Sequence, residues 1–95
     1  SLRFILNTAL EERVPVVGFS PEFARSGALL CLSVNYGDIG RQAGQLTRKI
    51  LDGHLSLPAK PLHPDRIEMS LNRKTAKFLD IEIPRDLEEK ADELY

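Results

Sequence analysis

The 95-residue chain is 42% hydrophobic and 28% charged, a composition that is typical of a globular protein and excludes wholesale disorder. Its 13 basic and 14 acidic residues give a net charge of -1, so it lacks the basic excess that usually marks a nucleic-acid-binding domain. The longest apolar stretch, residues 28–32, is far too short to span a bilayer, and the single cysteine excludes an internal disulfide framework or a cysteine-rich zinc site.

The first predicted elements are a helix and a strand. Apolar residues recur every three or four positions over residues 2–10, which predicts a helix that cannot continue past Pro15. The β-branched run 14–19 favours a strand that is buried on both faces, as in parallel sheets. The chain begins without a methionine and inside the predicted helix, with no cap before it. We therefore expect it to be a piece of a longer protein.

A short helix and a second strand are predicted next. Ser20 suits the N-cap and Pro21 the first position of a helix that ends at Gly27. Residues 28–34 then form a second apolar run, which predicts another buried strand. The order helix, strand, helix, strand is typical of α/β proteins.

The strongest helix signal covers residues 37–51. Asn35 suits its N-cap, and Gly53 suits a left-handed terminator. An apolar stripe at helical spacing consists of Ile39, Ala43, Leu46 and Ile50. Glycines also gather near one face, which predicts that another backbone packs closely there. These glycines are Gly37, Gly40 and Gly44.

The C-terminal third predicts a connection, a strand and two helices. Residues 54–65 contain three prolines without periodicity, which predicts an extended connection. Residues 66–71 alternate in polarity, which predicts a half-buried strand at a sheet edge. Asn72 suits the N-cap of a helix over residues 73–79, and Pro84 opens a last helix. The apolar face of that last helix would consist of Leu87, Ala91 and Leu94.

Catalytic and metal-binding signals are weak. Cys31 lies inside a predicted buried strand, which indicates core packing. His54 and His63 have no acid or cysteine at a spacing that would complete a metal site, so we expect surface histidines. Ser20 lies between a strand and a helix, but the glycine pattern of a nucleophile elbow is missing, so capping is favoured. We expect no catalytic residue, no metal and no cofactor.

The carboxyl ends of the two buried strands are better candidates, because ligands of parallel α/β sheets bind beyond such ends. Ser20, Glu22 and Phe23 follow the first strand, and Asn35 and Tyr36 follow the second. Each end combines an aromatic ring with polar groups beside a helix N-terminus, which suits a small polar or zwitterionic ligand. In the alternative interpretation, both rings pack and both polar groups only cap helices.

Several segments in this order resemble the C-terminal part of ABC-transporter substrate-binding proteins, in the branch allied to tryptophan and tyrosine binders. The longest begins Gly27-Ala28-Leu29-Leu30 and continues through Val34-Asn35-Tyr36-Gly37-Asp38 to Ile50-Leu51-Asp52-Gly53. The others are Val14-Pro15-Val16-Val17-Gly18, the strand and Asn-x-Lys-Thr-Ala helix start of residues 69–77, and Ile83-Pro84. The resemblance covers nearly the whole chain.

This resemblance implies a fragment of a two-lobed type I periplasmic-binding-protein fold, an α/β structure of parallel strands with flanking helices. The chain would be about the last third of such a protein. Residues 1–34 would belong to the C-terminal lobe, 35–36 would form a hinge crossing, and 37–65 would supply a helix and connection of the N-terminal lobe. Residues 66–95 would supply a returning strand and C-terminal helices.

The implied function is the solute-binding component of an ABC importer. Such a protein binds a small molecule, here an amino acid or similar compound, between two lobes in the periplasm or another extracytoplasmic place. It then delivers the ligand to a membrane permease, and the full-length protein can be lipid-anchored. The apolar stripe from Ile39 to Ile50 also predicts self-association of the fragment, or else a rearranged compact packing, because the lobe that would cover the stripe is missing. The loop Ser20-Pro21-Glu22 departs from the more polar loop of relatives, so the resemblance does not fix the ligand.

Two alternatives remain open. The same lobe is also used as a ligand-sensing domain of signalling or transcription-regulating proteins, and the sequence upstream of the chain would distinguish the two roles. A small α/β enzyme fragment would need an acid–base or nucleophilic constellation, which the sequence does not offer.

Overall fold

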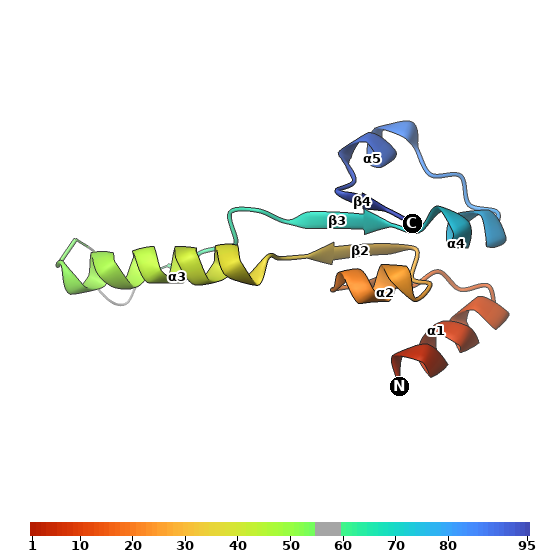
Figure 1. The fold of residues 1–95 in the computed structure, drawn as a ribbon, viewed down its shortest axis with the longest axis horizontal. Helices are drawn as coiled ribbons and strands as arrows, with labels where there is room; N and C mark the ends of the chain where they lie inside the picture. Colours follow the sequence, from red (N-terminus) through yellow and green to blue (C-terminus); the bar gives the residue numbers. More distant parts are fainter. Residues whose placement is uncertain (55–59) are drawn as a thin grey trace. The chain divides into compact units, whose positions relative to one another are not determined.

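The computed structural model describes residues 1–54 and 60–95, so Pro58, one of the three prolines of the predicted connection, lies outside the described residues. The chain divides into two compact units, residues 1–33 with 68–95 and residues 34–67. The first unit holds a sheet with short helices, and the second is built on one long helix (Figure 1).

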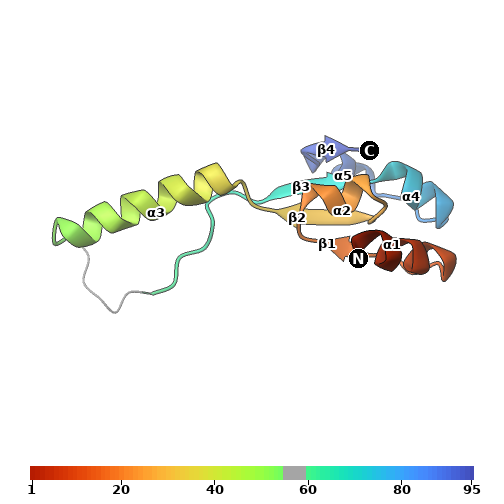
Figure 2. The same ribbon diagram turned by 60° about the horizontal axis from the view of Figure 1, so that its bottom comes forward.

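The first unit contains four strands and four helices among the described residues. The strands are β1 (Val17–Gly18), β2 (Leu30–Ser33), β3 (Glu68–Leu71) and β4 (Glu93–Leu94). The helices are α1 (Leu2–Glu11), α2 (Pro21–Arg25), α4 (Arg73–Phe78) and α5 (Arg85–Lys90). The strands form one sheet in the order β1-β2-β3-β4, in which β1–β2 and β3–β4 are parallel and β2–β3 is antiparallel. Helix α2 packs against this sheet (Figures 1 and 2).

The core of the first unit is small. Its fully buried cluster consists of Leu6, Ala24, Ala28 and Cys31, and partly buried side chains pack around it. Those surrounding side chains are Leu2, Val16, Phe23 and Tyr95. The prediction that Cys31 serves the core is therefore confirmed.

The two predicted buried strands are shorter and more exposed than expected. Only Val17 and Gly18 of residues 14–19 form a strand, and Val17 is 66% exposed. The reason is that β1 lies at the sheet edge, with β2 as its only neighbour in the described chain. In β2, Leu32 is exposed between buried Cys31 and Ser33, so this strand has one covered face and not two.

The C-terminal segment differs most from prediction. The last helix ends at Lys90, and Leu94 belongs to strand β4 and not to a helix face. Asp92 and Tyr95 donate backbone hydrogen bonds of 2.8 Å to the carbonyl oxygens of Met69 and Leu71. These bonds add a strand beside β3, so the prediction that residues 66–71 form an edge strand is wrong, and β3 lies between β2 and β4.

Two cap predictions also need correction. Helix α1 does have a cap, because the Ser1 hydroxyl accepts a hydrogen bond of 3.4 Å from the amide of Phe4. Ser20 occupies the N-cap of α2 in an extended conformation, but its side chain makes no capping hydrogen bond. Pro21 has no amide hydrogen, so the start of α2 has one fewer amide donor that needs a partner.

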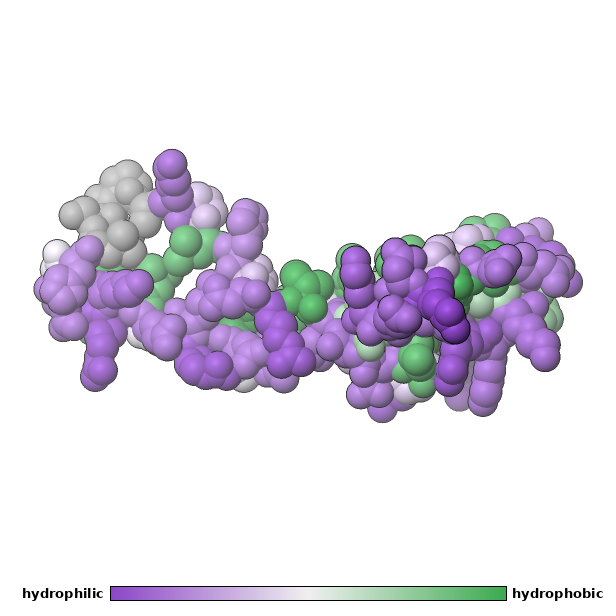
Figure 3. Space-filling model, turned by 90° about the horizontal axis from the view of Figure 1, so that it is seen from above, coloured by the Kyte–Doolittle hydropathy of each residue, from purple (hydrophilic) through white to green (hydrophobic). Residues whose placement is uncertain are grey.

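The second unit is built on α3 (Tyr36–Leu51), which begins one residue earlier than predicted. Asn35 caps it, and Gly53 follows it with a φ of +76°, as the sequence predicts. Apart from the neighbouring backbone of α3 itself, no described atom lies within 4 Å of a Cβ built at Gly40 or Gly44. The backbone that the glycine face predicts is therefore not found among residues 1–54 and 60–95. In Figure 3 hydrophilic residues cover most of the visible surface, and hydrophobic ones show in separate areas.

Candidate functional site

The carboxyl end of β1 carries two aromatic rings that contact each other. Phe23 packs directly on Gly18, because a Cβ at position 18 would lie 2.4 Å from the Phe23 Cβ atom. The Phe19 and Phe23 ring centroids are 4.7 Å apart, with the planes tilted by 49°. Phe19 is 76% exposed, whereas Phe23 is half-buried against the core. Phe19 therefore presents a ring that is supported from behind by a packed one.

Ser20 and Glu22 lie beside these rings. The carbonyl oxygen of Ser20 accepts a 3.0 Å hydrogen bond from the amide of Phe23, and the Ser20 side chain is half-buried. Glu22 is exposed in the first turn of α2. Both groups are available for polar contacts at this end of the strand.

The register of the parallel pair brings two chain exits to one sheet edge. Val17 pairs with Leu30 and Gly18 with Cys31, so β1 and β2 point the same way. The loop after β1 and the end of β2 at Ser33 consequently leave from the same edge of the first unit. This is the edge at which α/β sheets bind ligands.

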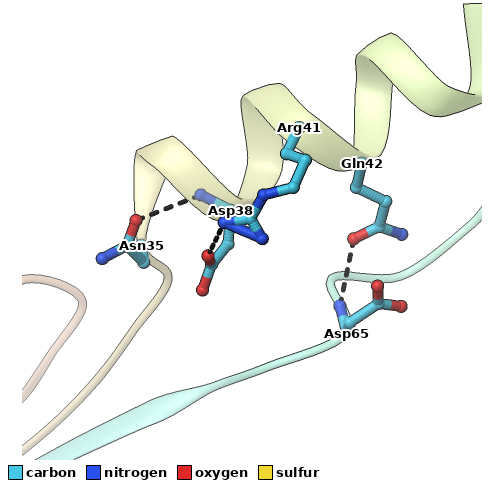
Figure 4. A network of polar contacts seen from close by, with 5 residues as sticks. All are labelled: Asn35, Asp38, Arg41, Gln42 and Asp65. Carbon is cyan, nitrogen blue, oxygen red and sulfur yellow. Dashed lines mark hydrogen bonds and ion pairs between the residues drawn. The ribbon is translucent and has the colours of Figure 1, made fainter.

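Asn35 and Tyr36 lie in the second unit, at the start of α3. Figure 4 shows Asn35 at this position. The Asn35 Oδ1 atom accepts a 3.1 Å hydrogen bond from the amide of Asp38, and the Asp38 carboxylate pairs with Arg41. The Asn35 side-chain amide points away from this cap and donates to no described residue. Tyr36 is 84% exposed. The capping role of Asn35 thus uses one side-chain atom and leaves the other for a further contact.

The second unit also contains a shallow groove beside α3. Gln42 holds the returning segment through two hydrogen bonds. Its Nε2 donates to the carbonyl oxygen of His63 at 2.8 Å, and its Oε1 accepts from the amide of Asp65 at 3.1 Å, as Figure 4 shows. The groove is about 200 Å³ and lies between α3 and this segment. Its apolar lining consists of Ile39, Ala43, Leu46, Leu62 and Pro64. Part of the predicted apolar stripe therefore faces a groove within its own unit.

The groups with intrinsic reactivity are placed as the sequence predicts. Burial raises the pKa of the Cys31 thiol, which disfavours its reactive thiolate. His54 and His63 are both exposed. In the described parts of the chain no three His, Cys, Asp or Glu side chains are grouped so that they could hold a metal ion. No described helix is long and apolar enough to cross a membrane.

The structure brings the predicted site residues together in two separate groups. Ser20, Glu22 and Phe23 share the end of β1 in the first unit, and Asn35 and Tyr36 share the start of α3 in the second. The sequence places Phe19 at the candidate end of the first predicted strand, directly before Ser20, but Phe19 is not among the five predicted ligand contacts. Its position next to Ser20, at the end of the apolar run, was the available signal.

Comparison with known proteins identifies the family. The sequence matches the family described as ABC transporter substrate binding protein over residues 1–95. The chain belongs to this family. The α/β fold class and the resemblance derived from the sequence are thereby confirmed, and the family is one of binding proteins.

Individual relatives agree with this assignment. The chain is 30% identical over 84 residues to a tyrosine-binding protein of Clostridioides difficile, covering 86% of this chain and 24% of the relative. It superposes with a TM-score of 0.62 on the ligand-free, open structure of a substrate-binding protein with adhesive properties from Clostridium difficile, at 26% identity, covering 97% of this chain and 30% of that one.

A third relative shows the fold alone. The structure of a Streptococcus pneumonia ABC domain in complex with L-Trp gives a TM-score of 0.65 at 20% identity, covering 96% of this chain and 31% of that one. The chain thus spans about a quarter of the curated relative and under a third of these solved chains.

Proposed function

We propose that the protein is the solute-binding component of an ABC importer, which binds a small molecule and delivers it to a membrane permease in an extracytoplasmic place. The observation that carries this proposal is membership of the substrate-binding family along all 95 residues. We also propose that the isolated chain self-associates. Leu51 is 80% exposed, and Ala43 of the apolar stripe is exposed on α3, so apolar side chains are available for contact with a second copy. Analytical ultracentrifugation of the chain tests self-association, and a monomer at high micromolar concentration contradicts it.

The ligand we infer is an amino acid with an aromatic side chain. The support comes from the 30% identical relative, which is named a tyrosine-binding protein. Two described rings offer exposed faces for stacking, Phe19 at 76% and Tyr36 at 84% exposure. In this proposal Ser20, Glu22 and Phe23, and separately Asn35 and Tyr36, contact the ligand in the intact protein. Residues 34–67 form a unit of their own, which supports the proposed boundary near the crossing at residues 35–36.

Titration calorimetry of the intact protein with L-tyrosine, L-tryptophan and L-alanine tests the proposal. Tyr36→Ala should weaken binding of an aromatic amino acid about two- to tenfold, because an aromatic pair of this kind contributes roughly 0.5–1.5 kcal/mol. Gln45→Ala is the control, since Gln45 is exposed on the same helix and belongs to neither the candidate site nor the apolar stripe. Wild-type protein that binds none of the three amino acids contradicts the inferred ligand class.

Asn35→Asp separates capping from ligand binding. An aspartate at this position still accepts the hydrogen bond from the amide of Asp38, so α3 keeps its cap. The variant removes the amide donor and adds a negative charge that repels a ligand carboxylate. We therefore expect unchanged thermal stability and binding weakened about tenfold or more. Equal affinity of Asn35→Asp and wild type would exclude Asn35 from the site.

A further inference from the structure

Asn72 is a buried polar residue at the junction of β3 and α4, and both ends of its side chain are engaged. It is only 6% exposed. Its Oδ1 atom accepts a 2.9 Å hydrogen bond from the amide of Thr75, which caps α4. Its Nδ2 atom donates a 2.7 Å hydrogen bond to the carbonyl oxygen of Ala24, which lies in α2. One side chain therefore starts one helix and holds another.

Thr75 makes a second connection, from α4 to the turn that directly follows α2. It is also 6% exposed, and its hydroxyl donates a 3.0 Å hydrogen bond to the carbonyl oxygen of Gly27. The last carbonyl groups of a helix have no partner within the helix. At the end of the five-residue helix α2, the carbonyl oxygen of Ala24 accepts from Asn72. The carbonyl oxygen of Gly27, two residues after the helix, accepts from Thr75. Asn72 and Thr75 thus hold the C-terminal end of α2.

The opposite end of α2 carries the candidate ligand contacts of the first unit. The helix is about 7.5 Å long at a rise of about 1.5 Å per residue. Glu22 and Phe23 lie in its first turn and Ser20 is its N-cap. Phe23 packs on Gly18 without room for a methyl group between them. Because the helix has only five residues, we expect a shift at its C-terminal end to move Ser20, Glu22 and Phe23 with it.

We propose that Asn72 and Thr75 are positioning residues, which hold α2 so that its N-terminal end stays in the geometry needed to bind the ligand. The inference rests on the proposed function for the ligand, and on the described hydrogen bonds for the tether. It gives physical roles to the Asn and Thr of the Asn-x-Lys-Thr-Ala segment at residues 72–76. The two residues act through α2 and make no contact with the ligand themselves.

Two substitutions at position 75 test the tether. Thr75→Val keeps the shape and removes the hydroxyl donor, whereas Thr75→Ser keeps the hydroxyl and removes a methyl group. In the intact protein we expect Thr75→Val to weaken binding of L-tyrosine about tenfold, and Thr75→Ser to bind within about twofold of wild type. If Thr75 only stabilised the fold, the affinity of both variants would fall in proportion to their loss of stability, because the serine variant also loses packing. That pattern would overturn the proposal.

Amide hydrogen exchange gives a readout that does not depend on the ligand. The amides of Ser26, Gly27 and Ala28 donate to carbonyl oxygens of α2, and we call residues 21–28 the α2 segment. Exchange at these three amides should be about tenfold faster in Thr75→Val and unchanged in Thr75→Ser. The amide of Ile39 in α3 is the internal control. If wild-type protein binds no aromatic amino acid, the inferred ligand fails, and the exchange rates still decide the tether. Equal exchange in all three proteins would overturn it.

Asn72→Asp is the second variant. It keeps the acceptor that caps α4 and replaces the donor to Ala24 with a carboxylate that repels the carbonyl oxygen. We expect faster exchange in the α2 segment with preserved protection of the Thr75 amide. Unchanged exchange at both Thr75 and residues 26–28 would show that Asn72 serves only as a cap, which would contradict a positioning role.

Discussion

Arg13 donates a 2.9 Å hydrogen bond from Nη1 to the carbonyl oxygen of Phe78, and its guanidinium carbon lies 5.2 Å from the centre of the Phe78 ring. The two residues are 65 positions apart in sequence. The hydrogen bond and the cation–π contact together connect the turn after α1 to the end of α4. Arg13 adopts a left-handed conformation with a φ of +56°, which non-glycine residues rarely occupy.

Substitution of Arg13 separates these contacts from the backbone strain. Arg13→Ala removes both contacts and keeps the strain, so we expect the free energy of unfolding to fall by about 1–2 kcal/mol. Arg13→Gly removes the same contacts but relieves the left-handed conformation, so its loss should be smaller. Urea denaturation measures both variants. An alanine variant as stable as wild type would show that the guanidinium contacts contribute nothing.

Gly18→Ala should disturb the aromatic pair at the end of β1. The added methyl group would lie 2.4–2.7 Å from atoms of Phe23, so the ring must move. We expect a loss of about 1–3 kcal/mol in the free energy of unfolding, which is usual for overpacking. Thermal and urea unfolding measure the loss.

Gly44→Ala is the control for that substitution. Its added methyl group meets nothing within 4 Å among the described residues, and Gly44 lies inside α3. In the 95-residue chain we expect a gain of about 0.5–1 kcal/mol from helix propensity. Destabilisation of the intact protein by the same substitution would reveal a close neighbour on the glycine face, as the sequence predicts.

Cys31 should make the protein less stable at alkaline pH. Burial raises the pKa of its thiol in the folded state, so above the unfolded pKa of about 8.5 the unfolded chain releases a proton that the folded chain retains. The stability that the neutral thiol contributes is complete below that pH and falls as the pH rises toward the folded-state pKa.

Urea denaturation of wild type and Cys31→Ala between pH 7 and about pH 10 measures this effect. The difference between their slopes isolates the thiol from tyrosine and lysine titration. The same burial predicts slow alkylation of Cys31 by iodoacetamide in the folded protein and rapid alkylation in urea. Parallel pH profiles of the two proteins would contradict the prediction.

Gln42 should control the order of the segment beside α3. Gln42→Ala removes both the bond to the His63 carbonyl oxygen and the bond from the Asp65 amide. Because these groups are exposed, we expect a small loss of about 0.5–1.5 kcal/mol together with faster hydrogen exchange at Asp65. Gln45→Ala, an exposed neighbour on the same helix, is the control. Unchanged exchange at Asp65 would show that Gln42 does not hold the segment.

The sequence by itself determined the elements that depend on near neighbours in the chain. Asn35 and Gly53 bound α3 as predicted, and Asn72 caps α4, because caps and helical periodicity involve contacts within about four residues. The α/β class and the family followed from the order of these elements and from a few short segments. The five candidate ligand contacts remain a proposal.

The tertiary structure decided which strands pair and which faces are covered. Phe19 ends an apolar run and yet is exposed, because β1 lies at the edge of the sheet that the described residues form. Leu94 fits a helical pattern and yet lies in β4, because Asp92 and Tyr95 bond to β3, more than 20 positions earlier. Strand pairing and burial depend on segments that are distant in sequence, and the local pattern carries no information about which segment will lie alongside.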